Sequence, residues 1–434
     1  MSIPCPKGWQ LMQLSDLCDF QNGYAFKNND FYDSSADAFI VFKMGNIERG
    51  GGLKRKAKNS YFPSSKAAKL RRFILNKGDI VMSMTDMKAS MALLGHTAMI
   101  DANDKYILNQ RVGRITVRED SLVDKLFLYY YTNSQPFVGH LRGVAHSGVQ
   151  VNLSTEEIKK SPVVLPSLDT QHCIASILSA YDDLIENNTR RIETLEEMAR
   201  RLYEEWFVHF RFPGHEQVSF KETELGRIPE GWEFANLGSV AKINPDTIKP
   251  KFTPDVINYI DIASVGTGRI DKTQSMKFSD APGRARRRVG PGDILWSCVR
   301  PNRRSHVLLV KPEVDTVAST GFAVLRAEAV PYTYLYYAVT THRFVDYLVN
   351  RATGAAYPAV KASDFEEADL LIPLAELLCS FHDIVEPSSN LINSLEKKNT
   401  NLRAQRDLLL PKLISGEIDV SDLSMPTDTE DKAA

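Results

Sequence analysis

Several features that often point to a function are scarce or missing in this sequence. Five cysteines stand scattered among 434 residues and form no CxxC pair, which favours a reduced, cytoplasmic protein without a structural zinc site. No run of about 18 apolar residues occurs, so no membrane span is expected. The first ten residues also lack the apolar core of a signal peptide.

Catalytic motifs are missing as well. The chain contains no GxxxxGK[ST] loop, no GxGxxG after a strand, no HExxH and no GxSxG. The stretch 244–247 (NPDT) departs at two positions from the Asn/Asp-Pro-Pro-aromatic stretch of adenine methyltransferases, and no Glu-x-Lys follows 254–255 (PD). The nine histidines are dispersed, and we interpret His146 and His306 as surface or groove residues. These absences argue against an enzyme, but they do not exclude a nuclease or methyltransferase with unrecognised motifs.

The sequence does contain an internal repeat. Five phrases recur in the same order: 8–9 (GW) at 231–232, 77–83 (KGDIVMS) at 291–297 (PGDILWS), 128–130 (LYY) at 335–337, 137–138 (FV) at 344–345 and 158–166 (IKKSPVVLP) at 365–373 (FEEADLLIP). The shift between the copies changes through the front part of each copy and settles at 207 residues in the rear part. Such a pattern predicts two similar halves, whose front loops differ in length.

Each half is expected to be an α+β domain followed by a long helix. Short apolar runs bounded by turn residues, such as 39–44, 79–84, 257–262 and 306–310, predict strands. The aromatic stretches 125–132 and 332–348 predict helices packed on those strands. The predicted fold class is therefore α+β, with two similar domains separated by two long antiparallel helices in a pseudo-twofold arrangement.

The rear helices have a heptad seam. Apolar residues recur in alternating steps of four and three from Ile174 to Trp206, and again 207 residues later from Phe381 to Leu413. An antiparallel pairing that places Asn188 against Asn399 matches apolar with apolar residues in seven of ten layers. The central layers are Ile185–Leu402, Asn188–Asn399, Ile192–Leu395 and Leu195–Ile392, and the outer layers include Ile174–Leu413, Tyr181–Arg406 and Trp206–Phe381.

A buried asparagine pair would fix the register of the two helices at a cost in stability. The alternative is that each seam packs only on its own domain. Two prolines bear on the second helix, which we expect to begin at Pro387 and to bend or end near Pro411.

The charge distribution suggests where DNA could bind. The net charge is −1, but Arg49–Arg72 holds nine Lys/Arg residues and no acid, and Arg284–Arg304 holds seven arginines and one acid. A solvated basic face would explain either cluster alone, whereas two clusters at comparable places in a repeat favour phosphate binding. The basic candidates are Lys54, Arg55, Lys56, Lys58, Lys66, Lys69, Arg71, Arg72 and Lys88 in the first half, and Arg284, Arg286, Arg287, Arg288, Arg300, Arg303 and Arg304 in the second.

A further candidate is the small-residue loop before each rear portion, at 145–154 and 352–361. Small residues would let the backbone approach a groove, and polar side chains there could contact base edges. The candidates are Ser147, Gln150 and Asn152 in the first loop and Tyr357 and Lys361 in the second. Ordinary hairpin chemistry is the alternative for both loops.

The duplicated GDI strands, the glycine-containing loops, LPSLDTQHCIASIL (165–178) and LLLPKLISGEI (408–418) together resemble the specificity subunit of type I restriction–modification systems. The resemblance covers nearly the whole chain, although PLAELLCSFHDIV (373–385) lacks the glutamine usual after its acid. It implies domain boundaries at 1–168 and 213–373 for two target recognition domains, at 169–212 and 374–420 for two spacer helices and at 421–434 for a disordered acidic tail.

The resemblance also implies a function without catalysis in this chain. Each recognition domain would read one half of a split DNA target, and the helix pair would set the gap between the halves. Two modification subunits would methylate adenine N6 with S-adenosylmethionine, and restriction subunits using ATP and Mg²⁺ could join them. The remaining alternatives are a stand-alone methyltransferase or nuclease and a coiled-coil scaffold that does not bind DNA.

Overall fold

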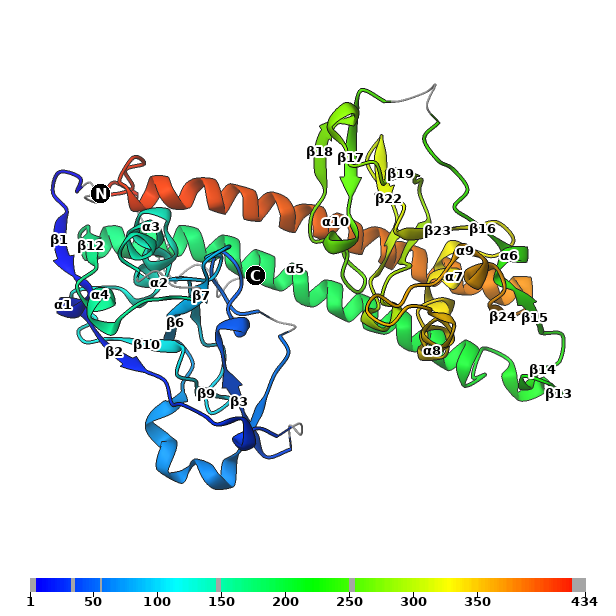
Figure 1. The fold of residues 1–434 in the computed structure, drawn as a ribbon, viewed down its shortest axis with the longest axis horizontal. Coiled ribbons are helices and arrows are strands. Elements are labelled where there is room, and N and C mark those ends of the chain that lie inside the picture. Colours follow the sequence, from blue (N-terminus) through cyan, green and yellow to red (C-terminus); the bar gives the residue numbers. More distant parts are fainter. Residues whose placement is uncertain (1–4, 33–35, 55–56, 146–149, 250–253, 424–434) are drawn as a thin grey trace, which may run out of the picture. The chain divides into compact units, whose positions relative to one another are not determined.

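The structure is a computed structural model that describes residues 5–32, 36–54, 57–145, 150–249 and 254–423. The chain forms two compact units (Figure 1). Unit 1 comprises 1–185 together with 401–434, and unit 2 comprises 186–400. Both ends of the chain therefore contribute to unit 1.

Unit 1 contains two four-stranded sheets. The larger sheet has the order β2-β10-β6-β8 and is antiparallel throughout. The smaller sheet has the order β4-β3-β9-β5, in which β3 and β9 are parallel. The strands are β2 (Cys18–Asn22), β10 (Val112–Val117), β6 (Ile80–Ser83), β8 (Thr97–Met99), β4 (Tyr61–Pro63), β3 (Ala38–Phe42), β9 (Tyr106–Leu108) and β5 (Ile74–Leu75).

Unit 2 has the same topology. Its sheets have the orders β16-β23-β20-β21 and β18-β17-β22-β19, and β17 and β22 form the parallel pair. The strands are β16 (Ala241–Ile243), β23 (Phe322–Ala327), β20 (Asp293–Ser297), β21 (His306–Leu309), β18 (Gln274–Lys277), β17 (Val256–Ile260), β22 (Thr316–Ser319) and β19 (Ala285–Arg288). The repeat read from the sequence is therefore a repeat of folds, and the two GDI phrases form the equivalent strands β6 and β20.

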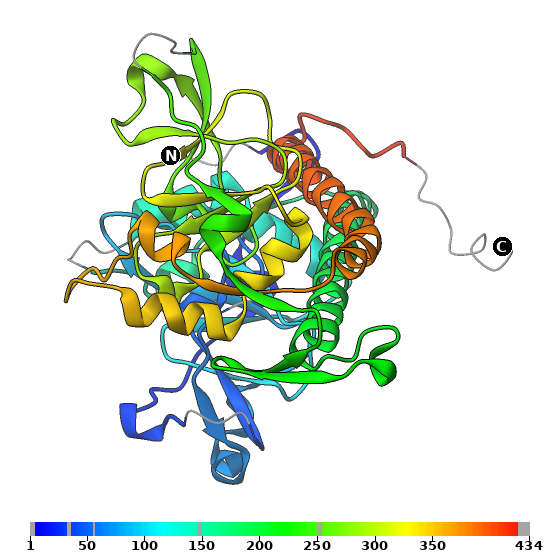
Figure 2. The ribbon, with the colours of Figure 1, turned by 90° about the vertical axis from the view of Figure 1, so that its right-hand side faces the viewer.

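In each unit, a short strand near its start pairs with the strand that precedes its long helix. β1 (Gln10–Gln13) pairs with β12 (Pro162–Leu165), and β15 (Glu233–Asn236) pairs with β24 (Asp369–Ile372). Unit 2 also has a hairpin of β13 (Phe220–Thr223) and β14 (Gly226–Pro229), which extends beside the C-terminal end of α5 in Figures 1 and 2.

Two helices pack against the larger sheet of each unit. They are α2 (Lys125–Asn133) and α3 (Gln135–Val144) in unit 1 and α7 (Tyr332–Ala338) and α8 (His342–Arg351) in unit 2. The predicted aromatic stretches lie in three of these helices and leave out 135–144. Asp124 caps α2 by accepting from Phe127 N, and Thr341 caps α8 by accepting from Phe344 N. Single-turn helices lie near the ends of the strand pairs: α1 (Leu14–Leu17), α4 (Thr155–Lys159), α6 (Leu237–Val240) and α9 (Ala362–Glu366).

The two long helices are α5 (Leu168–Tyr203), which ends in a π-helical turn at Glu204–Val208, and α10 (Ala375–Ile414). The expectation for Pro387 was wrong, because α10 begins twelve residues earlier, at Ala375. The end of α10 at Ile414 lies within one turn of Pro411, near the expected place. Both prolines are exposed, whereas Val385 and Leu395 are buried. Burial of the apolar face thus outweighs the hydrogen bond lost at each proline, a loss of about 3 kcal/mol in an isolated helix.

In unit 2 the seam pairs α5 with α10 in the predicted antiparallel register. Asn188 Nδ2 donates to Asn399 Oδ1 at 2.9 Å, and Asn399 Nδ2 donates to Thr189 Oγ1 at 3.2 Å. The rings of Trp206 and Phe381, another predicted layer, have centroids 6.1 Å apart. The helices therefore pair with each other here, and the idea that each seam packs only on its own domain does not hold.

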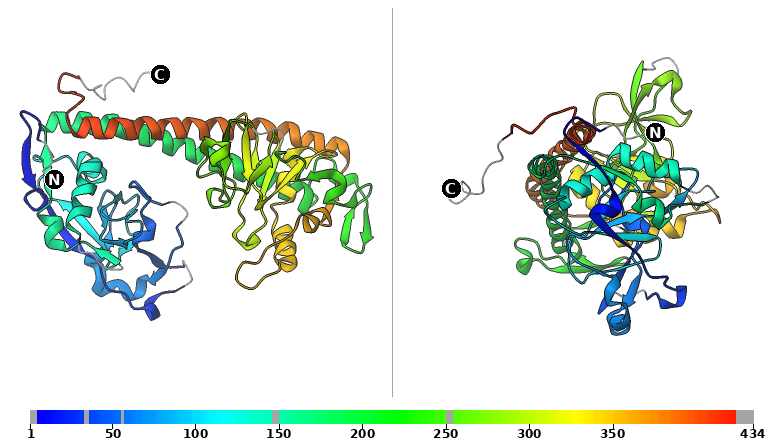
Figure 3. Two further views of the ribbon diagram at one scale, coloured as in Figure 1. Left: turned by 45° about the horizontal axis from the view of Figure 1, so that its top comes forward. Right: turned by 90° about the vertical axis from the view of Figure 1, so that its left-hand side faces the viewer.

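The part of the helix pair that lies in unit 1 is anchored by a charged contact. Arg406 Nη1 donates to Asp182 Oδ1 at 2.5 Å, and Tyr130 Oη of α2 donates to Asp182 Oδ2 at 2.7 Å. Arg406 thus pairs with the residue beside the predicted Tyr181. Figure 3 shows the two helices side by side within each unit.

Candidate nucleic-acid interface

In unit 1 the fold brings two sequence candidates together. β7 (Thr85–Met87) follows the GDI strand β6 directly, and it pairs with β11 (Gln150–Asn152). The register places Thr85 opposite Asn152 and Met87 opposite Gln150. We call residues 85–88 and 150–152 ribbon 1.

Unit 2 has the same arrangement in the equivalent place. Val299, just after β20, bridges to Ala359. Arg300 N donates to Pro358 O at 2.7 Å, and Val360 N donates to Cys298 O at 2.9 Å. We call residues 298–304 and 353–361 ribbon 2. Each ribbon thus joins the segment after a GDI strand, which holds basic candidates, to the small-residue loop before a rear portion.

Two buried side chains of β7, those of Thr85 and Asp86, hold ribbon 1 in place. Asp86 accepts from Met87 N and from Leu93 N, both at 2.7 Å, and Thr85 Oγ1 donates to Val151 O at 3.1 Å. Sequence reasoning missed this supporting role, because the partners of Asp86 and Thr85 come from distant segments. Local sequence supplied only one signal, a polar pair where the apolar strand stops.

The side chains that ribbon 1 exposes can contact a ligand. Met87 is 55% exposed, Lys88 and Asn152 are exposed, and Gln150 is half-buried. Asn152 Nδ2 donates to Gln150 O at 3.3 Å. The candidates Ser147 and His146 lie outside the described residues.

Ribbon 2 presents arginines. Arg300 and Arg304 have left-handed backbone conformations, each with φ +53°, and they flank a single 3-10 turn at Pro301–Arg303. Arg300 Nη2 donates to Ala356 O at 3.2 Å, and its guanidinium lies 4.6 Å from the ring centroid of Tyr357. Arg304 Nη2 donates to His342 Nδ1 at 2.6 Å.

The remaining ribbon 2 candidates, Arg303, Tyr357 and Lys361, are all exposed. Arg303 is exposed on the 3-10 turn. Tyr357 is 69% exposed. Lys361 is exposed, and its backbone N–H donates to Asp364 Oδ2 at 2.6 Å at the start of α9.

The four arginines between Arg284 and Arg288 lie on or beside β19, in the smaller sheet, and they have partners within unit 2. Arg284 pairs with Asp261 at 2.5 Å and Arg288 with Asp246 at 3.8 Å. Arg286 lies 5.0 Å from the ring centroid of Phe278. Arg287 Nη1 donates to Thr247 Oγ1 at 3.4 Å, and burial lowers its pKa. Much of the charge of this cluster is therefore balanced within the fold.

The first basic cluster forms a separate face of unit 1. The 3-10 helix η3 (Ser64–Phe73) buries Ala67 and Phe73 in the core of the smaller sheet. It exposes Lys66, Lys69, Arg71 and Arg72, and Lys54 and Lys58 are exposed in the preceding loop. Lys66 Nζ donates to Tyr32 Oη at 2.8 Å, and the Arg72 guanidinium lies 4.7 Å from the ring centroid of Phe73. The candidates Arg55 and Lys56 lie outside the described residues.

One histidine is placed differently from our expectation. His306 is only 5% exposed, and its ring lies 5.4 Å from that of Trp296 and 5.6 Å from that of Tyr336. Burial, with a smaller effect from Arg304, lowers its pKa to about 4. His306 is therefore a neutral core residue of β21 and not a surface or groove residue.

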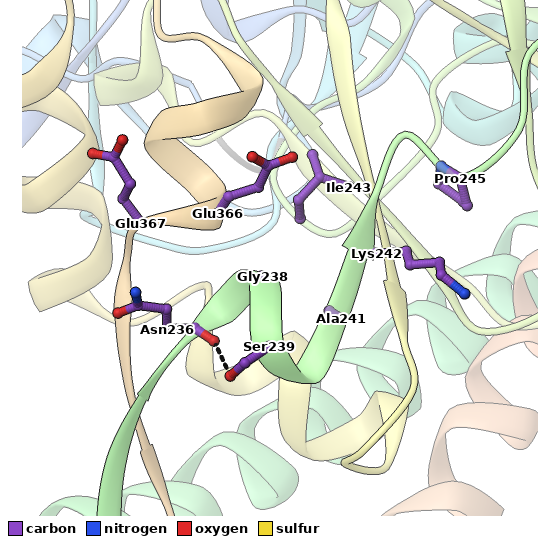
Figure 4. Close-up of a pocket in the computed structure, with 9 residues that line it drawn as sticks. All are labelled: Asn236, Gly238, Ser239, Ala241, Lys242, Ile243, Pro245, Glu366 and Glu367. Carbon is purple, nitrogen blue, oxygen red and sulfur yellow. Dashed lines mark hydrogen bonds between the residues drawn. The ribbon is translucent and has the colours of Figure 1, made fainter.

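Unit 2 also has an open hollow of about 620 Å³ beside α6 and β16 (Figure 4). Ser239 Oγ donates to Asn236 O at 2.6 Å, Lys242 points away from the hollow and pairs with Glu328, and the Glu366 and Glu367 carboxylates stand apart. These groups form no nucleophile–base pair. Among the described residues, no group of three His, Cys, Asp or Glu side chains could hold a metal ion, and no helix could cross a membrane.

Comparison with known proteins shows a similarity to specificity subunits of type I restriction enzymes. Residues 6–197 match the family model for the type I restriction modification DNA specificity domain. The chain is 25% identical to the type I restriction enzyme MjaIX specificity subunit of Methanocaldococcus jannaschii, with 96% of this chain and 95% of that protein covered. It is 23% identical to the MjaVIII specificity subunit of the same organism, again with 96% and 95% covered.

A solved structure has the same fold. The S subunit of a type I restriction–modification system from M. genitalium aligns with a TM-score of 0.55 and 16% identity, covering 95% of this chain and 98% of that one. The likeness extends over both units and both long helices, which agrees with the α+β repeat described above.

Proposed function

We propose that this chain is a type I restriction–modification specificity subunit, which selects the DNA sequence on which a modification and restriction complex acts. Unit 1 would read one half of a bipartite target and unit 2 the other half. The α5–α10 pair would set the gap between the halves. The chain itself would bind double-stranded DNA without catalysing a reaction.

One observation carries this proposal. In both units a ribbon stands at the same place of the repeated fold, directly after the GDI strand, yet the exposed side chains of the two ribbons differ. Phosphate contacts position a protein on DNA, whereas side chains that reach base edges read the sequence. A shared scaffold with unshared exposed residues suits two readers of different half-sites.

The chemistry would belong to partner subunits. Two modification subunits would transfer a methyl group from S-adenosylmethionine to adenine N6, after extruding the target base. Restriction subunits that use ATP and Mg²⁺ would join the same complex. We place this assembly in the cytoplasm. Within the chain we propose residues 1–168 and 213–373 as the target recognition domains and 169–212 and 374–420 as the spacer segments.

The basic face of η3 and the arginines on and beside β19 suit a role in positioning DNA rather than in reading its sequence. We propose that Lys54, Lys58, Lys69, Arg71 and Arg72 of unit 1, and Arg284, Arg286, Arg287 and Arg288 of unit 2, hold DNA phosphates. Contacts of this kind make affinity fall linearly with salt concentration on a log–log scale. A scaffold that does not bind DNA would show no such dependence.

The experiment that tests the proposal maps methylated adenines in the host genome with and without this gene. We expect a bipartite motif with a fixed gap to be methylated only when the gene is present. An unchanged methylation map would contradict the proposal. Methyl transfer or DNA cleavage by the purified chain alone would instead identify it as an enzyme.

A further inference from the structure

We infer that Arg303 is the residue with which unit 2 reads a base, and that the base is guanine. The inference rests on the proposed function and adds to it the chemistry of one half-site. It follows from three observations on ribbon 2: how its turn is held, which arginine is left free, and how ribbon 1 differs.

The turn that carries Arg303 is held at both ends. Arg300 and Arg304 adopt φ +53° on either side of it. Residues other than glycine seldom adopt this backbone conformation, and it often marks functional loops. The backbone N–H of Arg300 binds Pro358 O at 2.7 Å, and Thr267 Oγ1 donates to Arg304 O at 2.9 Å. The backbone of Arg303 is therefore fixed before any ligand arrives.

The side chains of the ribbon 2 arginines are not equally available. Arg300 is committed to Ala356 O and to the ring of Tyr357, and Arg304 is committed to His342. Arg303 is exposed. Within the described part of the chain, no hydrogen bond, ion pair or aromatic ring engages its guanidinium. All five of its donors can therefore turn to a ligand.

An arginine presented in this way suits one base. The guanidinium fork matches O6 and N7 of guanine in the major groove, the commonest specific contact between a side chain and a base. The exposed face of Tyr357 and the engaged Arg300 border the turn, so they can position the same stretch of DNA. Pre-organisation of the turn lowers the entropy lost on binding.

Ribbon 1 presents no arginine. Its exposed residues are Met87, Lys88 and Asn152, with Gln150 half-buried beside them. Amide side chains match N6 and N7 of adenine, and apolar groups suit the thymine methyl. The arginine readout therefore belongs to one half-site only, and its loss should leave the other half-site unchanged.

The first test is methylation mapping with Arg303→Gln and Arg303→Lys in cells that supply the modification subunits. We expect R303Q to relax one guanine position in one half-site, while the gap and the other half stay constant. R303K should keep that guanine with less complete methylation. Arg227→Gln, which removes an exposed charge from the hairpin of unit 2, is the control and should leave the motif intact.

The second test uses the purified complex of this chain with its modification subunits. Each guanine of the mapped half-site is replaced in turn by 7-deazaguanine, which lacks the N7 acceptor. We expect one replacement to weaken binding of the wild-type complex by about tenfold, and the same replacement to leave binding by the R303Q complex unchanged.

The outcomes separate the inference from the proposed function. If the wild-type chain directs no bipartite methylation, the proposed function fails. If it does so but R303Q weakens binding equally on every sequence, or no guanine replacement distinguishes the two complexes, Arg303 holds phosphate and the inference is overturned. If R303Q abolishes methylation, mapping gives no motif and the 7-deazaguanine measurement decides. The inference holds if one guanine replacement weakens binding by the wild-type complex but not by the R303Q complex, and it is overturned if no replacement distinguishes the two complexes.

Discussion

Asn399 shows how one residue can limit the ways in which two helices pair. It is 3% exposed in the α5–α10 seam of unit 2, accepts from Asn188 and donates to Thr189. In an apolar seam this layer is satisfied only when the two asparagines meet, so a shifted register would bury unpaired amides. Heptad spacing and a single asparagine in each seam were enough to predict this pairing from the sequence.

The asparagine layer leads to a stability prediction. Asn188→Leu alone should lower the free energy of unfolding by about 1–3 kcal/mol, because the buried Asn399 loses its donor. The double variant N188L/N399L should recover that loss, since both partners become apolar. Urea unfolding of each variant measures this, with Asn401→Leu at an exposed position of α10 as control. If the two substitutions simply add, the pair is not coupled as described.

Glu396, also on α10, predicts a pH dependence. Burial, with the nearby Glu196, raises the pKa of Glu396 from 4.5 to about 7. The folded chain therefore holds this proton more tightly than the unfolded chain does. The resulting stability is fully present below pH 4.5 and is lost as pH rises through about 7, by at most about 1.4 kcal/mol per pH unit.

Glu396→Gln should remove this loss. The variant should match the wild type at pH 4 and should unfold at a higher temperature at pH 8. Thermal unfolding between these values measures the difference, and Glu224→Gln in the exposed hairpin turn is the control. Parallel pH profiles for wild type and E396Q would show that the pKa of Glu396 is the same in the folded and unfolded chains.

At the scale of elements, the ribbons show where sequence reasoning stops. The GDI strands, the aromatic helices and the heptad seam repeat with regular spacing, so the sequence predicts them. β7 and β11 are three residues each and lie more than sixty residues apart, and no periodicity marks such a pair. Sequence reasoning named the first segment only through the basic residue Lys88 and the second through its small and polar residues. The pairing of the two depends on the tertiary fold. The same fold carries α10 through Pro387 and Pro411 against the local preference.

Ribbon 1 can be tested through the residue that supports it. Asp86→Ala should leave the backbone N–H groups of Met87 and Leu93 without their acceptor, a loss of about 1–3 kcal/mol for each group. We expect incomplete or relaxed methylation at one half-site only. Mapping of methylated adenines measures this, and Asp86→Asn, which keeps one acceptor oxygen, should have a smaller effect. Relaxation of both half-sites would mean that Asp86 supports more than its own ribbon.

At the scale of the whole chain, the repeat gives the proposed function a geometric consequence. α5 has 36 residues and α10 has 40, and both are continuous helices. Inserting four residues into α5 and four into α10, at the paired layer of Ile192 and Leu395, adds about 6 Å of helix at 1.5 Å per residue. We expect the gap of the methylated motif to lengthen by one or two base pairs, at about 3.4 Å each, while both half-sites stay the same. An equal insertion between β13 and β14 lengthens no spacer and should leave the gap unaltered. If the variant with insertions in both α5 and α10 still directs methylation at the original gap, the helices do not set the spacing. The partner subunits must then hold the two units apart.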